Sequence, residues 1–287
     1  MSGAQVDQPA YNSSPITKGA MFTAVKPDTG QPPEELTKEE SAMAESGGCL
    51  IAEEKQGSPP GIMRQIYMRF GAYVVFLLVI LFGVSGRLDW IHAWVYLALV
   101  AAFMIMRANS LTGEDEDMLL ERMRAFRKEN IQSWDKVLAP LVAVAGPVAI
   151  LLACAMETRY HWPPPVPVWI SVVAFCVYVA GFQFSRRAMM ENRFFSAVAR
   201  VQTDRGHKLV DTGPYSRVRH PGYAGAMVFH MATPLALGSL WGVIPAVITA
   251  VLLVIRAWLE DRFLAVELDG YREYSRRVTS RLVPRVW

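Results

Sequence analysis

The sequence of 287 residues is poor in cysteine and in charge. Its three cysteines, Cys49, Cys154 and Cys176, are far apart and form no Cys-x-x-Cys or Cys/His pair, so they indicate neither a disulfide framework nor a metal site. No Gly-x-Gly-x-x-Gly follows a strand-like run, which argues against a Rossmann-type enzyme. Charged residues make up only 19%, the net charge is +3, and hydrophobic residues make up 52%. This composition favours a membrane protein whose partner is the lipid bilayer, with no nucleic acid bound.

Residues 1–62 contain no sustained apolar period. They are rich in proline, glycine, serine and glutamate, as in QPPEELTKEESAMAESGG, and such a segment cannot bury enough surface to fold. We therefore expect a disordered tail. The tail has no arginine, which argues against a mitochondrial transit peptide, and no apolar core before a cleavage site, which argues against a signal peptide. The sequence shows neither a Met-Gly start nor a C-terminal CaaX box, so we expect no lipid anchor of these kinds.

Six apolar runs follow the tail. Each holds 16 to 20 residues, close to the roughly 20 that a helix needs to cross a bilayer. They occupy residues 70–86, 90–106, 137–156, 166–185, 223–238 and 241–259. The shortest contains Pro234 and is expected to cross fully or in part. The predicted fold class is all-α and integral to the membrane, with five to six transmembrane helices.

The distribution of positive charge predicts the orientation of these helices. If the tail is cytoplasmic, the outer connections carry only Arg87 and Arg159, and Arg256 lies within a run. All other Lys and Arg residues then fall on the tail, the two long loops and the C-terminal segment, as the positive-inside rule requires. We expect six crossings with both termini in the cytoplasm, in a bacterial inner membrane or an endoplasmic reticulum.

The polar segments divide the chain further. Residues 63–185 form an N-terminal transmembrane part, whose long loop, 107–136, contains EDEDMLLERMRAFRKEN and predicts an amphipathic interfacial helix. Residues 186–287 form a C-terminal part around the hairpin of the last two runs. Its loop, 186–222, is expected to extend a helix through RRAMMENRFF and then to form two strand-like pieces, AVARVQ and HKLVDT, about a turn at 203–206.

The segment GPYSRVRHPGYAG contains candidate anion-binding residues at the start of the fifth apolar run. Pro221 is favoured at the first position of a helix, so His220 is expected at a helix N-terminus, where free N–H groups and the dipole attract an anion. Arg217 and Arg219 add positive charge beside it. The alternative is an ordinary basic membrane flank with tyrosines as interface anchors.

Ionisable residues in the last run favour a polar site. Arg256 and Glu260 are four apart, so they share a helix face and can pair, with Asp261 beside them. A hairpin through 238–242 brings Glu260 close to His220. Such a site suits a zwitterion that also carries a cation, and S-adenosylmethionine is one such ligand. His230 has no second metal-type residue three or four positions away, so we expect it to be packed or hydrogen-bonded.

These motifs in combination resemble a known family. The stretches NRFFSAVARVQTDRGHKLVDTGPYSRVRHPGYAG and RAWLEDRFLAVELDGYREYSRRVTSRLVPRVW flank an apolar hairpin. They are similar to the isoprenylcysteine carboxyl methyltransferase family and its phospholipid methyltransferase relatives. The resemblance implies a membrane enzyme that binds S-adenosylmethionine in a cytoplasmic C-terminal cofactor pocket and takes lipophilic substrates from the bilayer. Residues 186–287 would be its catalytic core.

The resemblance also implies site residues by position. Arg256, Glu260 and Arg219 would lie near the reacting groups. One departure is that Asp261 follows Glu260 where two glutamates are usual, which leaves the role of the second carboxylate open. The cofactor would contact Gln202, His207, Leu209, Tyr215, His220, Pro221, Tyr223, Glu260, Glu267, Tyr271 and Tyr274.

The acceptor is not decided by these residues. The carboxylate of a prenylated cysteine is already ionised at pH 7 and needs only an arginine to orient it. An amine headgroup or a thiol would first have to lose a proton. The leading hypothesis is a membrane methyltransferase that uses S-adenosylmethionine on an isoprenylcysteine-like acceptor. Alternatives are a phospholipid N- or thiol S-methyltransferase, a sterol-type reductase using NADPH, and a non-catalytic scaffold. The oligomeric state stays open.

Overall fold

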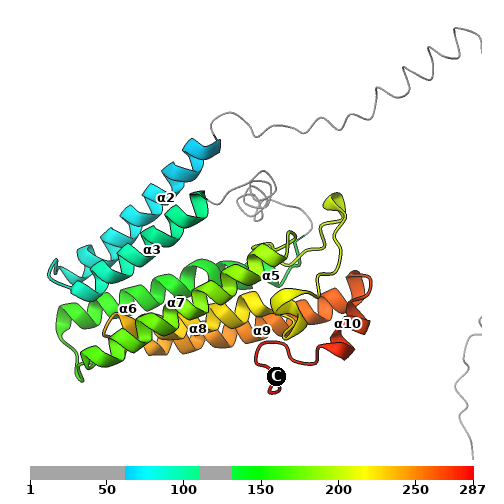
Figure 1. Ribbon diagram of the computed structural model, residues 1–287. Coiled ribbons are helices and arrows are strands. Elements are labelled where there is room, and N and C mark those ends of the chain that lie inside the picture. The colour runs from blue at the N-terminus through cyan, green and yellow to red at the C-terminus, as the bar shows by residue number, and fades with distance from the viewer. Residues whose placement is uncertain (1–61, 110–130) are drawn as a thin grey trace, which may run out of the picture. The chain divides into compact units, whose positions relative to one another are not determined.

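The computed structural model describes residues 62–109 and 131–287, within one unit that spans 56–287. The described residues form helices, short 3-10 turns and irregular loops, with no strand among them (Figure 1). Nearly all of the expected disordered tail, 1–62, and most of the expected amphipathic loop, 107–136, lie outside the described residues. Both expectations therefore stay predictions.

Eight α-helices in the described part carry the fold. Two of them continue without a break into a π-helical turn, η1 (Val79–Gly83) after α2 and η3 (Leu141–Ala145) after α5. The α-helices are α2 (Ile62–Leu78), α3 (Ile91–Asn109), α5 (Asp135–Pro140), α6 (Gly146–Tyr160), α7 (Val168–Glu191), α8 (Pro221–Ala236), α9 (Val243–Glu267) and, as a short C-terminal helix, α10 (Tyr271–Arg277).

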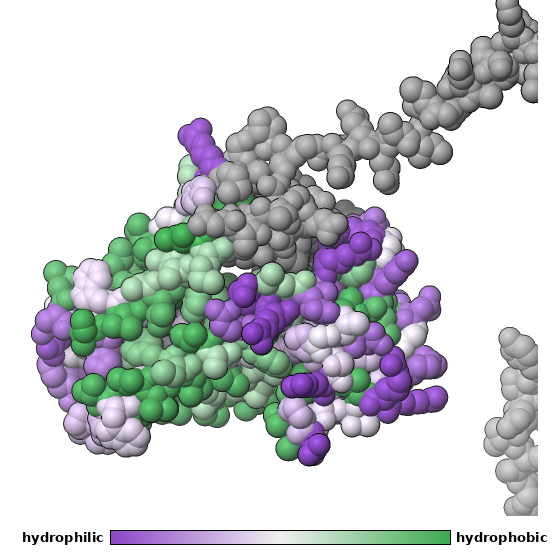
Figure 2. Space-filling view, viewed as in Figure 1, coloured by the Kyte–Doolittle hydropathy of each residue, from purple (hydrophilic) through white to green (hydrophobic). Residues whose placement is uncertain are grey.

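Among the residues that the structure describes, four helical stretches are long and apolar enough to cross a membrane: 64–83, 135–160, α7 and α9. The apolar part of α3, 91–106, is shorter, and α8 has 16 residues. Large apolar side chains such as Trp169 and Ile248 are more than half exposed, which suits contact with lipid. Figure 2 shows hydrophobic residues covering the middle of this helical part, a large group of hydrophilic residues around the α10 end and a smaller group at the opposite end. The all-α membrane fold is confirmed, and the number of crossings stays a prediction.

Helices α7 and α8 approach each other closely. A Cβ added at Gly225 would lie 2.6 Å from both Gly181 O and Ser185 N, so only glycine allows this backbone contact. The Ser185 hydroxyl donates a hydrogen bond of 3.1 Å to Gly222 O. The beginning of α8 is therefore held against the C-terminal part of α7.

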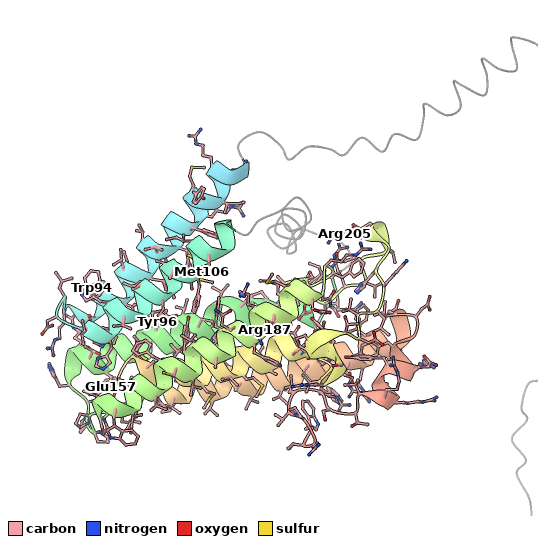
Figure 3. The ribbon with its side chains drawn as sticks, in the orientation of Figure 1. Trp94, Tyr96, Met106, Glu157, Arg187 and Arg205 are labelled. Atoms are coloured by element: carbon pink, nitrogen blue, oxygen red, sulfur yellow. The ribbon has the colours of Figure 1, made fainter. Side chains whose placement is uncertain are left out.

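The predicted hairpin between α8 and α9 is present, and a buried carboxylate holds its turn. Glu157, from α6, accepts hydrogen bonds from the Ser239 hydroxyl and from the backbone N–H groups of Leu240 and Trp241, the last two at 3.2 and 3.0 Å. These donors include backbone groups that the turn leaves unpaired, so the carboxylate satisfies them. Figure 3 shows Glu157 and Arg205 near opposite ends of the helical part.

The loop between α7 and α8 differs from the prediction. The turn at 203–206 is confirmed as η4 (Thr203–Arg205), and η5 (Gly213–Ser216) precedes α8. The two predicted strand pieces are wrong, since residues 192–220 are all described and contain no strand. Side chains take the backbone donors that a strand pair would need: Ala199 N–H donates to Asp135 Oδ2 and Gln202 N–H to His207 Nδ1.

Candidate functional site

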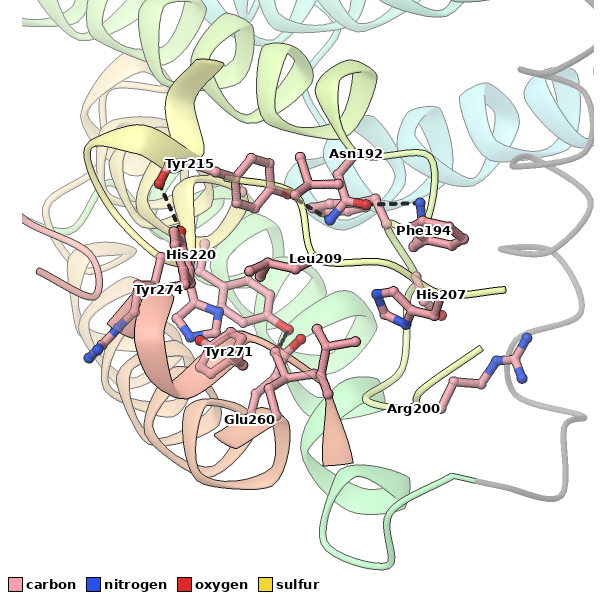
Figure 4. Close-up of a pocket in the computed structure, with 18 of the residues that line it drawn as sticks. Asn192, Phe194, Arg200, His207, Leu209, Tyr215, His220, Glu260, Tyr271 and Tyr274 are labelled. Atoms are coloured by element: carbon pink, nitrogen blue, oxygen red, sulfur yellow. Dashed lines mark hydrogen bonds between the residues drawn. The ribbon is translucent and has the colours of Figure 1, made fainter. Parts of the chain in front are cut away.

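A polar cavity lies where α8 begins, between the α7–α8 loop, the end of α9 and α10 (Figure 4). Of the residues predicted for the site, it brings nine together in its lining. They are Arg219, His207, Leu209, Tyr215, His220, Tyr223, Glu260, Tyr271 and Tyr274. Residues from four separate stretches of sequence therefore share one space.

Three tyrosines form an aromatic wall of this cavity. Tyr271 donates its hydroxyl proton to Asp261 Oδ1 at 2.8 Å, and Tyr274 donates to Tyr215 O at 2.7 Å. Burial raises the pKa of Tyr215, Tyr271 and Tyr274, and the Asp261 carboxylate adds to the effect at Tyr271. The three phenols are therefore neutral at physiological pH and present ring faces that can attract a cation.

His220 and Arg219 join the start of α8 to the C-terminal segment. The backbone N–H of Arg219 donates to Ser280 O at 3.0 Å, and that of His220 donates to Arg281 O at 2.9 Å. His220 is the N-cap of α8, as predicted. Within the described part of the chain, Arg219 Nε and His220 Nε2 are buried and make no well-aligned hydrogen bond, but both face the Asp261 carboxylate. The start of α8 is therefore joined to the C-terminal segment by backbone hydrogen bonds and faces a carboxylate of α9.

Asp261 binds the protein's own groups and does not line the cavity. Its Oδ2 accepts from Arg281 Nε at 3.0 Å, and its Oδ1 accepts from the Tyr271 hydroxyl. Arg219 Nε lies 2.9 Å from Oδ1 and His220 Nε2 lies 3.6 Å from it. This carboxylate thus holds α8, α9, α10 and the C-terminal segment together, which gives the second acidic residue a structural role.

Glu260 and Arg256 do not pair, contrary to the prediction. Glu260 points into the cavity and accepts from the Tyr223 hydroxyl at 2.5 Å. Arg256 instead forms a two-pronged ion pair with Asp135, with Nε–Oδ1 at 2.7 Å and Nη2–Oδ2 at 2.9 Å. Its Nη2 also donates to Ala197 O at 2.7 Å. Asp135 has no exposed surface and needs this partner, and its two oxygens match the planar guanidinium.

Three predicted cofactor residues are not in the cavity lining as the described residues form it. Pro221 is fully buried behind the lining, and Glu267 is exposed. Gln202 is also fully buried, and its side-chain amide donates to Phe194 O at 2.6 Å. Its backbone N–H donates to His207 Nδ1 at 3.2 Å, so Gln202 orients a lining residue.

His207 is held in its neutral form. Its Nδ1 accepts a backbone hydrogen bond, and its ring stacks on Phe194 with centroids 4.5 Å apart. Burial lowers its pKa to about 4, and the nearby charges of Arg200 and Arg205 act in the same direction. At neutral pH the ring therefore offers the cavity an uncharged aromatic surface.

A second, larger cavity adjoins the first. Its volume is about 520 Å³, and its lining is mostly apolar, with Phe182, Phe229 and Leu253 among its residues. Arg256 belongs to this second cavity, with its guanidinium carbon 5.2 Å from the centroid of the Tyr223 ring. The two cavities share a wall of four residues: Phe195, Ser196, Gly222 and Tyr223.

Comparison with known proteins finds relatives of this part of the chain. The family model described as phospholipid methyltransferase matches residues 169–268. A probable protein-S-isoprenylcysteine O-methyltransferase of Oryza sativa is 28% identical over 134 residues, which cover 44% of this chain and 64% of that protein. Protein-S-isoprenylcysteine O-methyltransferase B of Arabidopsis thaliana is 26% identical over 125 residues, which cover 42% of this chain and 60% of that protein. The matched region thus spans less than two thirds of these relatives.

Comparison with solved structures adds further matches. A solved structure of the eukaryotic intramembrane Ras methyltransferase, isoprenylcysteine carboxyl methyltransferase, aligns with a TM-score of 0.47 and 16% identity, over 76% of this chain and 75% of that one. The family model and the curated relatives confirm the resemblance to isoprenylcysteine carboxyl methyltransferases and phospholipid methyltransferases that the motifs predicted.

Proposed function

We propose that this chain is an integral membrane methyltransferase that uses S-adenosylmethionine to methylate the carboxylate of an isoprenylcysteine-like acceptor. The observation that carries the proposal is the pair of cavities. One is polar and aromatic, the other is apolar, and only four residues separate them. A water-soluble methyl donor and a lipophilic acceptor would meet at this shared wall, and holding them there would supply much of the rate.

The polar cavity has groups that fit S-adenosylmethionine. When bound, this cofactor would supply an electrophilic methyl group on a sulfonium. The Glu260 carboxylate and the tyrosine rings would attract its cationic groups. The N-terminus of α8, with Arg219 and His220 beside it in the cavity lining, would receive its carboxylate. The cavity volume is about 90 Å³, below the roughly 300 Å³ of common ligand sites, so binding requires the lining side chains to move apart.

The apolar cavity suits the acceptor. Its volume of about 520 Å³ lies within the range of roughly 300–1,000 Å³ for small-molecule sites. Arg256 stands at the shared wall, beside Tyr223. Nε and Nη2 of Arg256 are used by Asp135 and Ala197, whereas its Nη1 makes no hydrogen bond in the described part of the chain. That nitrogen is the donor that would hold an acceptor carboxylate next to the methyl group.

The placement of charge favours a carboxylate over an amine acceptor. A carboxylate is ionised at pH 7 and attacks without a base. An amine headgroup would need a base beside it and would meet the positive charge of Arg256. The carboxylate of Glu260 faces the other cavity and binds the Tyr223 hydroxyl. These positions support O-methylation more strongly than N-methylation.

The proposal is tested with the full chain in lipid nanodiscs and S-adenosylmethionine labelled on its methyl group. We expect label in N-acetyl-S-farnesylcysteine as a base-labile ester, and little in phosphatidylethanolamine or a small thiol. Calorimetric titration should give heat with S-adenosylhomocysteine and none with NADPH. Arg219→Ala should weaken S-adenosylhomocysteine binding, and Arg217→Ala, an exposed neighbour, is the matched control. Heat with NADPH alone would point to a reductase, and no heat with S-adenosylhomocysteine would refute the proposal.

A further inference from the structure

A histidine stands inside the apolar cavity without a hydrogen bond. His230, on α8, lines the second cavity, and its ring packs against that of Phe229 with centroids 4.4 Å apart. The sequence predicts a packed or hydrogen-bonded residue. The structure shows the packing, but His230 makes no hydrogen bond within residues 64–106 and 131–287. A polar group in apolar surroundings costs free energy unless it is paired, so a ligand atom is the expected partner.

Other polar groups lie at the same level of the cavity. Tyr178, on α7, also lines it, and its ring meets Phe229 edge-on with centroids 6.0 Å apart. Thr233 lines it one turn further along α8. The Thr233 hydroxyl donates its proton to Phe229 O at 2.7 Å and keeps only acceptor capacity. His230 and Thr233 thus give α8 two polar residues about one turn apart in the cavity lining.

The distance to the reacting end follows from the helix. His230 comes seven residues after Tyr223, which is in the shared wall, so two helical turns or about 10 Å separate them on one face. Ala226 and Phe229 line the cavity between them. Along α8 the cavity is thus polar at Arg256 and Tyr223, apolar in the middle, and polar again at His230. An unbroken hydrocarbon chain would match only the middle.

We infer that the apolar cavity prefers an acceptor with one hydroxyl or carbonyl oxygen in its chain over one with an unbroken hydrocarbon such as farnesyl, and that His230 binds that oxygen. An extended chain advances roughly 1.1–1.2 Å per bond, so about 10 Å places the oxygen roughly nine bonds from the reacting carboxylate carbon. The inference rests on the proposed function, because the carboxylate is placed at Arg256. His230 then acts as a specificity-determining residue, which selects acceptors by the position of an oxygen.

Binding of simple carboxylates tests this directly. The full chain in nanodiscs is titrated with octadecanoic acid, 10-hydroxyoctadecanoic acid and 17-hydroxyoctadecanoic acid, and the dissociation constants are compared. One hydrogen bond predicts that the 10-hydroxy isomer binds about three- to tenfold more tightly than the 17-hydroxy isomer. His230→Leu should bring this ratio to about one, and His230→Gln should restore part of it. His92→Leu is the matched control, because His92 lies on α3 and lines neither cavity.

Two results would overturn the inference: equal binding of the isomers by the unaltered chain, or an isomer ratio that His230→Leu does not change. A water molecule that satisfies His230 would give the first result. The titration needs no methyl transfer, so the two proposals fail separately. A chain that prefers the 10-hydroxy isomer and methylates nothing would refute the proposed function alone. A chain that methylates farnesylcysteine and shows no isomer preference would refute only the role of His230.

Discussion

The ion pair between Asp135 and Arg256 should dominate the stability of the site. Asp135 has no exposed surface and Arg256 is 4% exposed, so removing one partner leaves the other charge buried and uncompensated. Losses of this kind cost about 3–5 kcal/mol. Asp135→Leu should therefore destabilise the chain by about 3–5 kcal/mol. For a chain of this size that corresponds to a fall in the unfolding midpoint of about 6–20 °C.

A double-mutant cycle separates the interaction free energy of Asp135 and Arg256 from the contributions of the residues around them. In Asp135→Leu/Arg256→Met neither charge of the pair remains, while the Ala199 N–H loses its acceptor and Ala197 O loses its donor. We expect the double variant to recover at least about 2 kcal/mol of the loss seen in Asp135→Leu. Unfolding is followed by tryptophan fluorescence of the detergent-solubilised protein, in both thermal and SDS titrations. Equal destabilisation of the single and double variants would refute the argument, as would a loss below about 1 kcal/mol in Asp135→Leu.

Loss of the Asp135–Arg256 ion pair should also change the kinetics of methyl transfer. Asp135→Asn keeps the size of the side chain and removes its charge, so Arg256 loses the partner that orients it. We expect a higher KM for the acceptor and a nearly constant KM for S-adenosylmethionine, because Arg256 belongs to the second cavity only. A variant that merely loosened the fold would raise both, and that outcome would contradict an orienting role for Asp135.

Three further predictions concern the polar cavity and its wall. The pKa of His207 is about 4 in the folded chain and near 6.5 when unfolded, so below pH 6.5 only the unfolded state takes up the proton and stability falls towards pH 4. His207→Gln should fall less steeply when unfolding midpoints are compared at pH 7 and pH 5. A Cβ at Gly222 would lie 2.6 Å from the Phe195 ring, so Gly222→Ala should slow methyl transfer at least about tenfold. Gly71→Ala, with open space around it, is its control. Glu260→Gln should weaken S-adenosylhomocysteine binding about tenfold or more in calorimetry and leave the unfolding midpoint nearly unchanged.

The helices could be predicted because they follow from local composition. Long apolar runs correspond to α7 and α9, and the short connection at 238–242 predicts the hairpin that the structure contains. The neighbourhood of His220 and Glu260 follows from that hairpin, since two antiparallel helices bring their distant ends together. The gathering of Tyr271 and Tyr274 at the same cavity followed only from the family motif, because no local period links them to α8.

Long-range pairing could not be predicted in the same way. The i, i+4 spacing favours a pair between Arg256 and Glu260, but Asp135, 121 residues away, takes the arginine. One signal was available: a carboxylate at the edge of an apolar run is costly unless a cation meets it. The strand-like pieces failed for a related reason, because Asp135 also accepts the backbone N–H of Ala199. Which distant side chain competes for a backbone donor is decided only by the folded structure.

Glu157 has a consequence for the site at the other end of the hairpin. Its carboxylate fixes the turn from which α9 begins, and Glu260 lies 18 residues after Gly242, about 27 Å along the helix. A helix turns by about 100° per residue, so one residue inserted in the turn would swing Glu260 to another face and away from the Tyr223 hydroxyl. By fixing the turn, the carboxylate of Glu157 thus sets the rotation of α9 about its axis, and with it the direction in which the Glu260 side chain points.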